Sequence, residues 1–530
     1  MITGKNYIGN KLSATGNSTF KTVNPVLNLE NTTLFHEASP SEINEAVAIA
    51  SQAYREYRQV SGSSKALFLR AIATEIEALG DLLIETYTSE SGLPQGRAIG
   101  ERGRTMGQLQ QFATLLEEGS WVEASMDTAQ KDRRPIPKVD MRKMLIATGP
   151  VVVFGASNFP LAFSTAGGDT AAALAAGCPV IVKAHPMHSG TSELVASAII
   201  KAANDTGMPE GVFSHLNGKG IAVGTALVQH PDVKSVAFTG SLKGGKALFD
   251  LANKRPEPIP VFAEMGSLNP VVLLPEILEE KAEELGTNYA NSIMMGSGQF
   301  CTNPGLLIGI KSPGLERFII SLGTAISQQE PQCMLHPVIA SNYNNLSDQM
   351  QQESHINTVG QYDKSVAENH SRARITSISA QEFISNPTLH QEVFGPYSLI
   401  ITCENKQQLQ EVVSSLEGQL TATIMGTNTE VTTYKNTIDT LTEKVGRILF
   451  NGVPTGVEVC PSMHHGGPFP ASTDGRFTSV GTGAIKRFVR PVCFQNWPSS
   501  LLPQELQNNN SIGLFRYING NYSRENIKPS

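Results

Sequence analysis

The chain has 530 residues, of which 40% are hydrophobic and 17% are charged, and its formal net charge is −7. These values are typical of a globular protein large enough for two or three domains. Because the chain has no basic tract, nucleic acid is excluded as an expected partner.

The sequence contains no pattern that predicts a signal peptide, a membrane span or a metal site. Residues 1–9 contain no apolar segment of signal-peptide length, and the most apolar region, residues 145–182, is interrupted by glycine, proline and polar residues. We therefore expect no membrane span and a cytoplasmic location. The six cysteines have no paired spacing and no CxxC or HxxxH pattern occurs, so neither a disulfide framework nor a metal site is expected. The adjacent pair His464 and His465 is interpreted as structural or substrate-lining.

Helices are predicted in the first part of the chain. Ser39, Pro40 and Glu42 form a capping-box pattern that predicts a helix start. Apolar residues at helical spacing predict a second helix over residues 67–87, and a third begins near Arg97.

From Met144 onward, short apolar runs alternate with helical segments. The predicted strands include residues 151–154, 180–182, 212–213, 235–238 and 259–262, and the predicted helices lie at 165–176, 189–203 and 242–253. This alternation predicts an α/β fold with a Rossmann-like, doubly wound parallel sheet, which binds ligands at the C-terminal ends of its strands.

A second α/β unit is predicted from about residue 264 to residue 457. Its strands are expected near residues 306–310, 398–402, 421–425 and 447–450, with a long helix before Cys301. Residues 328–385 are polar and irregular, so they are expected to form mainly surface loop and helix.

Three polar side chains are candidates for catalysis. Cys301 follows a turn with two glycines, which leave space around a sulfur nucleophile. Asn158 follows an apolar strand, where its amide could donate a hydrogen bond to an oxyanion. Glu264 also ends a strand, where a carboxylate could act as a general base. Taken singly, each residue fits a structural role as well: a loop cysteine, a turn-forming asparagine or an ion-paired glutamate.

Cofactor contacts are suggested at further strand ends. Lys183 could bind a ribose hydroxyl or a phosphate, and Gly240 and Ser241 open a helix whose free N–H groups suit a pyrophosphate. Glu392 could accept hydrogen bonds from a ribose, with Phe394 packing nearby.

Six motifs, read in order, resemble the aldehyde dehydrogenase superfamily over residues 24–488. They are Ser-Asn-Phe-Pro at 157–160, Val-Ile-Val-Lys at 180–183, Phe-Thr-Gly-Ser at 238–241, Glu-Met-Gly-Ser at 264–267, Gly-Gln-Phe-Cys at 298–301 and Glu-Val-Phe-Gly-Pro at 392–396. The resemblance implies that Cys301 is the nucleophile, Glu264 the general base and Asn158 an oxyanion donor. It also implies that Lys183, Ser241 and Glu392 contact a nicotinamide cofactor.

The resemblance further implies a division into domains and an assembly. We expect a cofactor-binding domain over residues 1–122 and 146–262, a catalytic domain over 263–458, and an oligomerisation arm and tail over 123–145 and 486–530. A homodimer or homotetramer is expected.

The chain departs from the family pattern after Lys183. A glutamate that would bind the adenosine ribose is replaced by Pro186, so the repulsion of a 2′-phosphate is lost. Lys183, Lys219 or His185 could attract that phosphate. We therefore favour NADP over NAD as the cofactor.

The motif variants resemble a narrower branch of the family. That branch contains the α-ketoglutaric semialdehyde (2,5-dioxovalerate) dehydrogenases and an NADP-linked long-chain aldehyde dehydrogenase. The favoured substrate is the small aldehyde 2,5-dioxopentanoate, oxidised to 2-oxoglutarate through a thiohemiacetal and a thioester on Cys301, and a fatty aldehyde is the alternative. The expected substrate-binding residues are Arg102, Arg104, Gln108, Phe159, Phe300 and Phe469. Either arginine could clamp the carboxylate of the dioxo acid.

Two further readings compete with this one. A catalytically silent member kept as a structural or binding protein is disfavoured by the intact Cys301, Glu264 and Asn158. A CoA-acylating enzyme is disfavoured because such enzymes typically lack a base at the position of Glu264.

Overall fold

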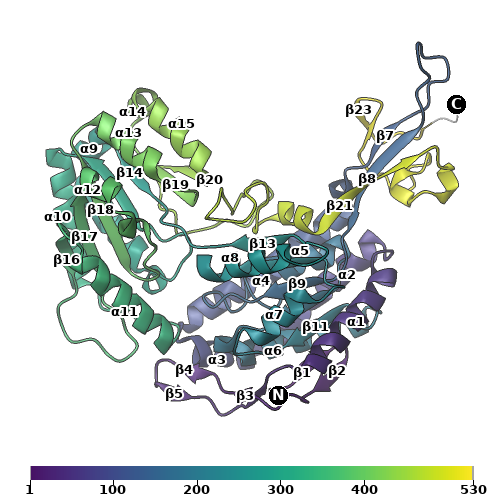
Figure 1. Ribbon diagram of the computed structural model, residues 1–530, viewed down its shortest axis with the longest axis horizontal. Helices are drawn as coiled ribbons and strands as arrows, with labels where there is room; N and C mark the ends of the chain where they lie inside the picture. Colours follow the sequence, from purple (N-terminus) through teal and green to yellow (C-terminus); the bar gives the residue numbers. More distant parts are fainter. Residues whose placement is uncertain (1, 528–530) are drawn as a thin grey trace.

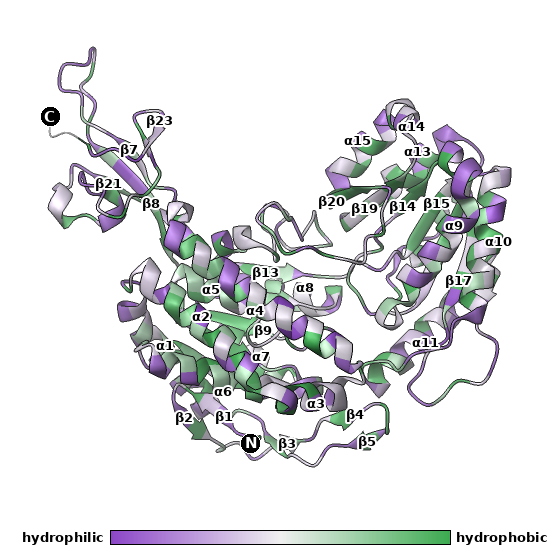
Figure 2. Ribbon diagram, turned by 180° about the vertical axis from the view of Figure 1, so that it is seen from behind, coloured by the Kyte–Doolittle hydropathy of each residue, from purple (hydrophilic) through white to green (hydrophobic). Residues whose placement is uncertain are grey.

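Two sheets with their helices form two lobes, and a third, smaller sheet projects from them as an arm (Figure 1). The computed structural model describes residues 2–527. Strands inside the lobes are mostly hydrophobic, while the outer helices mix hydrophobic and hydrophilic residues (Figure 2). No helix within residues 2–527 is long and apolar enough to cross a membrane.

The first lobe is built on a seven-stranded sheet. Its strands, in spatial order, are β13 (Val261–Glu264), β12 (Ser235–Thr239), β9 (Val151–Phe154), β10 (Val180–Lys183), β11 (Phe213–Leu216), β1 (Asn6–Ile8) and β2 (Lys11–Ser13). The strands from β13 to β11 run parallel, whereas β1 and β2 are antiparallel additions. The doubly wound parallel sheet is therefore confirmed.

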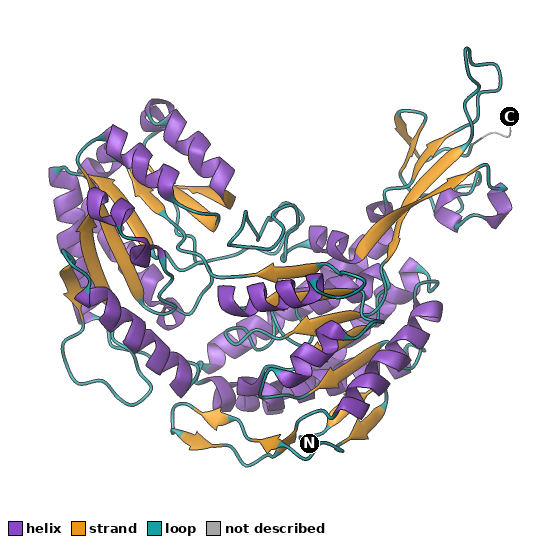
Figure 3. Cartoon of the chain, viewed as in Figure 1, coloured by secondary structure: helices purple, strands orange, loops and turns teal. Residues whose placement is uncertain are grey.

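Helices cover both faces of this sheet (Figure 3). One face packs against α2 (Gly62–Ala78), α4 (Gln95–Glu118), α5 (Gly168–Ala176) and α6 (Ser189–Asp205), and the other against α1 (Pro40–Tyr57), α7 (Ala222–Gln229) and α8 (Leu242–Asn253). The capping box at Ser39 and Glu42 is present.

The single helix predicted over residues 67–87 is wrong, because α2 ends before Leu79 and α3 (Gly80–Ser91) begins at Gly80, whose φ is +56°. Glycine reaches that left-handed conformation readily, so the chain bends there although the apolar spacing continues.

The second lobe contains another seven-stranded sheet. Its strands are β16 (Asn357–Gln361), β17 (Arg374–Ser379), β18 (Tyr397–Cys403), β15 (Leu306–Ile310), β14 (Val271–Leu273), β19 (Gln419–Met425) and β20 (Val445–Phe450). Its helices are α9 (Pro275–Met294), α10 (Pro313–Gln328), α11 (Pro337–Gln352), α12 (Ala380–Ser385), α13 (Lys406–Ser415), α14 (Asn428–Thr433) and α15 (Lys435–Lys444). The expectation of loop and helix over residues 328–385 missed β16 and β17. β16 is a polar edge strand with an irregular register, so it lacks the apolar pattern of a buried strand.

The arm is a five-stranded sheet that joins distant parts of the chain. Its strands are β21 (Val489–Gln495), β8 (Met141–Ala147), β7 (Ser125–Asp127), β22 (Arg516–Ile518) and β23 (Asn521–Ser523). Near the amino end of the chain, two short ribbons, β3 (Thr19–Phe20) with β6 (Phe35–His36) and β4 (Val23–Asn24) with β5 (Leu29–Glu30), complete the fold.

The strand register brings the candidate residues to one edge of the first sheet. Phe154 pairs with both Lys183 and Phe238, and Thr239 pairs with Glu264. The segments that follow these strands therefore emerge side by side.

Candidate active site

Cys301 lies in a tight turn that follows α9. Gly296, Ser297 and Gly298 have φ of 56°, 56° and 65°, so the chain turns sharply before the cysteine. A Cβ on Gly298 would lie 2.3 Å from the Gly395 backbone, and only glycine allows this approach. Asn269 Nδ2 donates to the carbonyl oxygen of Cys301 at 2.8 Å. The turn thus fixes the direction in which the sulfur points.

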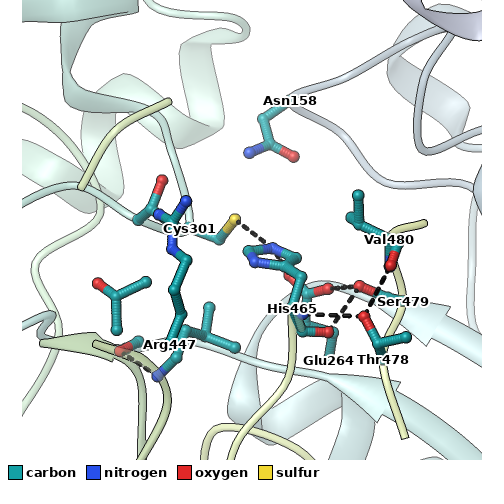
Figure 4. A network of polar contacts seen from close by, with 12 residues as sticks. Asn158, Glu264, Cys301, Arg447, His465, Thr478, Ser479 and Val480 are labelled. Carbon is teal, nitrogen blue, oxygen red and sulfur yellow. Dashed lines mark hydrogen bonds and ion pairs between the residues drawn. The ribbon is translucent and has the colours of Figure 1, made fainter. Parts of the chain in front are cut away.

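The sulfur contacts a buried histidine and, through it, a buried carboxylate. Cys301 Sγ lies 3.4 Å from His465 Nε2, which lies 2.9 Å from Glu264 Oε1 (Figure 4). His465 is 1% and Glu264 3% exposed, so water screens this cluster poorly. The structure therefore brings together two of the predicted catalytic residues and adds a third side chain to them.

The sequence interpretation did not place His465 at the sulfur. Its backbone N–H donates to Thr478 Oγ1 at 2.9 Å, the Ser479 hydroxyl donates to Glu264 Oε2, and the Ser479 backbone N–H donates to the His465 carbonyl oxygen at 2.8 Å. The pair His464 and His465 was the only signal in the sequence, and it did not indicate which ring faces Cys301.

The cluster shifts the pKa of both ionisable partners of His465. Burial raises the pKa of the Cys301 thiol well above its usual value, and the negative charge of Glu264 raises it further, so the resting sulfur is a thiol. Burial alone would raise the pKa of Glu264. The positive field of His465 and hydrogen bonds from His465, Ser479 and Cys301 outweigh burial and lower it. Glu264 is therefore ionised at neutral pH and can accept a proton.

Asn158 faces the thiol from a loop that a buried glutamate supports. Its Nδ2 donates to the carbonyl oxygen of Gln299 at 3.1 Å, which leaves the second amide hydrogen for another acceptor. Glu101 Oε1 accepts the backbone N–H groups of Leu161 and Ala162 at 2.8 and 3.0 Å. Glu101 thereby orients the loop that carries Asn158.

The arginines of α4 differ in their surroundings. Residues two apart on a helix point about 200° apart, so Arg102 and Arg104 cannot both face the site. Arg102 Nη1 lies 3.5 Å from the carbonyl oxygen of Gly80, away from the sulfur. Arg97 Nε is paired with Glu101 at 3.3 Å and lies over the Phe159 ring.

Arg104 places a buried guanidinium on the side of α4 that faces the aromatic rings. It lies 5.3 Å from the centre of the Phe163 ring, and its Nε and Nη2 are buried without a hydrogen-bond partner among residues 2–527. Burial lowers the pKa of Arg104, while the fields of Glu101, Cys301 and Glu264 raise it. A buried guanidinium with free donors is suited to an anionic ligand.

Apolar side chains gather beside Asn158 and Cys301. Phe159 packs edge-to-face on Phe163 and on Phe300, with ring centres 5.3 and 5.4 Å apart. Ala156, Ala162 and Val480 complete this cluster. Phe469 and Gln108 are not part of this cluster.

Phe469, which is also expected to line the pocket, is 58% exposed. The carbonyl oxygens of Pro468 and Phe469 lie against Gly418. Gln108 Nε2 lies 2.3 Å from the place that a Cβ on Gly168 would take, so Gln108 packs against the start of α5.

A cationic region lies at the end of β10. Lys183 is 8% exposed, and burial lowers its pKa to about 8, while the charge of Glu37 acts in the opposite direction. The exposed Lys219 follows β11, and its backbone N–H donates to Glu37 Oε1 at 3.0 Å. His185 is predominantly neutral because burial and neighbouring positive groups hold its pKa well below the usual value. It can therefore supply a hydrogen bond but not the attractive charge that the sequence suggested.

The start of α8 has the features of a phosphate cradle. A Cβ on Gly240 would lie 2.6 Å from the Phe238 ring, so glycine keeps this turn open. Ser241 caps α8 by accepting the N–H of Gly244 at 3.2 Å, and its hydroxyl hydrogen remains available. Thr239 Oγ1 is buried without a partner in the described part of the chain. These groups fit the pyrophosphate of a dinucleotide.

Glu392 is the last of the expected cofactor contacts. It lines a cavity together with Ser267, Gly298, Phe300 and Phe394. Burial raises the pKa of Glu392 to about 7, although the Ser267 backbone N–H acts against this shift. A Cβ on Gly266 would lie 1.9 Å from Glu392 Oε2, so this glycine makes room for the carboxylate.

The sequence profile of the aldehyde dehydrogenase family matches residues 12–489. The chain belongs to the aldehyde dehydrogenase family. It is 46% identical to alpha-ketoglutaric semialdehyde dehydrogenase 2 of Azospirillum brasilense over 520 residues, which cover 98% of this chain and 99% of that protein. It is also 45% identical to alpha-ketoglutaric semialdehyde dehydrogenase of Acinetobacter baylyi, over 98% of each chain.

The aldehyde dehydrogenase fold is also seen in solved structures. Betaine aldehyde dehydrogenase of Staphylococcus aureus, crystallised with NAD+, superposes with a TM-score of 0.80 over 93% of this chain and 95% of that chain, at 17% identity. At that identity the likeness establishes the α/β fold. As an aldehyde dehydrogenase, the chain uses a nicotinamide cofactor.

Replacing Gly266 with alanine tests whether Glu392 contacts that cofactor. Because the added Cβ displaces the Glu392 carboxylate, Gly266→Ala is expected to raise the cofactor dissociation constant at least about tenfold, as for one lost charge-assisted hydrogen bond. Titration calorimetry without aldehyde measures this directly. Gly100→Ala is the matched control, since a Cβ there would meet nothing within 4 Å. Unchanged affinity in Gly266→Ala would rule out a cofactor contact by Glu392.

Proposed function

We propose that this aldehyde dehydrogenase oxidises 2,5-dioxopentanoate to 2-oxoglutarate. The observation that carries the proposal is Arg104, a guanidinium beside the sulfur with buried donors and no partner among the described residues. Such a group matches the distant carboxylate of a dioxo acid. Two relatives over nearly the full length carry the corresponding name, which supports the same assignment.

The reaction begins with the thiol of Cys301. Because its pKa is raised, the proton must pass to a neighbouring base as the sulfur attacks the aldehyde carbon. Glu264, which accepts a hydrogen bond from the Cys301 side chain, is in reach of that proton. The S–C bond forms, and the aldehyde oxygen becomes an oxyanion that accepts hydrogen bonds from Asn158 Nδ2 and the Cys301 backbone N–H.

The second half of the reaction releases the acid. When bound, the oxidised nicotinamide supplies the acceptor for the hydride that leaves the thiohemiacetal carbon, and a thioester remains on Cys301. Glu264, which is ionised at neutral pH, then takes a proton from water. The resulting hydroxide adds to the thioester carbon, the C–S bond breaks, and Cys301 leaves as a thiolate.

A long-chain fatty aldehyde is the competing substrate. The cluster around Phe159, Phe163 and Phe300 could hold an alkyl chain. Such a chain would also cover Arg104 without pairing its charge, and an uncompensated buried charge is costly. We therefore propose the dioxo acid as the physiological substrate.

Removing the Arg104 charge tests the substrate assignment. Arg104→Leu is expected to lower kcat/KM for 2,5-dioxopentanoate by about 10- to 100-fold, mainly through KM, because a charged hydrogen bond contributes about 1.5–3 kcal/mol. Arg104→Leu should oxidise hexanal, which lacks a carboxylate, at least as well as wild type does. Arg102→Leu is the control, since Arg102 points toward Gly80. The assignment would be overturned if wild-type enzyme oxidised decanal with a higher kcat/KM than 2,5-dioxopentanoate. It would also be overturned if Arg104→Leu lowered kcat/KM equally for 2,5-dioxopentanoate and hexanal.

For the cofactor, we propose NADP as the preferred form. Lys183 and Lys219 supply positive charge at the end of β10, and Pro186 removes a carboxylate from the loop that follows. Glu37 opposes the preference, because its charge acts on Lys183 and would repel a 2′-phosphate.

Neutralising Glu37 should increase the preference for NADP. Glu37→Gln is expected to raise kcat/KM for NADP several-fold without improving NAD, because it removes only a repulsion specific to the phosphate. Steady-state kinetics with both cofactors measure the ratio, and Glu45→Gln on the exposed face of α1 is the control. A wild-type enzyme with a higher kcat/KM for NAD than for NADP would contradict the proposed preference. If Glu37→Gln had the same ratio of kcat/KM values for the two cofactors as wild type, Glu37 would have no part in cofactor selection.

We also propose a homodimer or homotetramer in the cytoplasm. β20 and β21 are edge strands with unpaired backbone groups, and β20 also carries the exposed Ile448 and Phe450, so a second copy could cover these edges. A cytoplasmic, reducing location suits a nucleophile that must stay a free thiol.

A further inference from the structure

The side chains around Cys301 have the composition of a metal site. Glu264 at the end of β13, Cys301 after α9 and His465 in a later loop each offer one ligand atom, and these atoms lie within 4.8 Å of one another. Sulfur, imidazole nitrogen and carboxylate oxygen are the three donor types that proteins use for zinc.

The spacing of the three atoms is close to that of a tetrahedral zinc site. Zinc binds sulfur at about 2.3 Å and nitrogen or oxygen at about 2.0–2.1 Å, so a tetrahedral ion separates S from N by about 3.5 Å and N from O by about 3.3 Å. Cys301 Sγ and His465 Nε2 are 3.4 Å apart, and His465 Nε2 and Glu264 Oε1 are 2.9 Å apart. The first distance matches the tetrahedral value, the second is a few tenths of an ångström shorter, and all three ligand atoms lie within 4.8 Å of one another.

His465 can present a free lone pair to such an ion. Its Nδ1 is buried and has no hydrogen-bond partner among residues 2–527, so the ring proton can reside there while Nε2 binds the metal. Cys301 and Glu264 would contribute two negative charges, which neutralise a divalent cation in this poorly hydrated place.

We propose that Glu264, Cys301 and His465 bind Zn²⁺ as a reversible inhibitory site, with a fourth position open toward Asn158. On binding, the thiol proton is released to solvent and the sulfur becomes a zinc thiolate, so no redox step is involved. The bound sulfur cannot attack an aldehyde, and Glu264 cannot activate water. Zinc binding itself is independent of the proposed catalytic roles, whereas the inhibition rests on them.

Two readouts test the site without relying on activity. Metal-free enzyme is titrated with Zn²⁺ against a chromogenic chelator, and the iodoacetamide reaction of Cys301 is followed by peptide mass analysis. We expect one tight site per chain and at least a tenfold slower alkylation of Cys301, both reversed by EDTA. Co²⁺ in place of Zn²⁺ should give a thiolate-to-metal absorption band in the near ultraviolet.

Variants then identify the ligands. His465→Asn and Cys301→Ala are expected to weaken Zn²⁺ binding at least about 100-fold, because each removes one of three protein ligands. His464→Asn and Cys460→Ser, which change the same residue types nearby, should bind as wild type does. The proposed site would be overturned if Zn²⁺ did not slow the alkylation of Cys301 in wild-type enzyme. It would also be overturned if Cys301→Ala bound Zn²⁺ as tightly as wild type does. If Cys301→Ala loses Zn²⁺ but still oxidises aldehydes, the metal site stands and the proposed mechanism fails.

Discussion

Cys301, His465 and Glu264 come from separate stretches of the chain and meet where the two lobes adjoin. A buried carboxylate is costly unless its charge is compensated. Here the field of His465 and hydrogen bonds from Ser479 and Cys301 provide that compensation, and they lower the pKa of Glu264 despite burial. The same carboxylate raises the pKa of the thiol. The general base is therefore charged, and the nucleophile is protonated until a substrate arrives.

The placement of positive charge follows from the same constraint. Glu101 neutralises Arg97 and, with its other oxygen, orients the loop of Asn158, so one carboxylate serves both tasks. Arg104 lies on the same helix, α4, but it does not pair with Glu101. An anion that enters the site thus meets the Arg104 guanidinium, which has no partner among residues 2–527, beside aromatic rings. A neutral alkyl chain meets the same guanidinium without any means of pairing it. This difference is the physical basis for favouring the dioxo acid.

Local sequence signals predicted much of the fold. The alternation of strands and helices in the first lobe is confirmed, and the predicted helix over residues 242–253 and strand over 306–310 have the bounds of α8 and β15. Apolar spacing could not reveal the break at Gly80, because the pattern continues through it. It also could not reveal β16, whose polar residues lie at a sheet edge.

Prediction of the active site from the sequence has a similar limit. Motifs predicted Cys301, Glu264 and Asn158 as site residues, and the structure brings Cys301 and Glu264 to the same histidine. His465 is 164 residues from Cys301 in sequence, and its contact depends on how Thr478 and Ser479 hold its loop. No local pattern encodes that distance. The distinction between Arg102 and Arg104 could have been drawn from helix geometry, but which of them faces the sulfur depends on the packing of α4.

The most direct test of the account is capture of the acyl group on Cys301. Glu264→Gln enzyme, mixed with 2,5-dioxopentanoate and NADP or NAD, should accumulate a thioester because water is no longer activated. Intact-mass and peptide analysis should then show Cys301 heavier by the mass of the aldehyde minus two hydrogens, together with one equivalent of reduced cofactor. Cofactor reduction without any adduct, or an adduct on another residue, would contradict the central claim that Cys301 is the nucleophile and Glu264 the base.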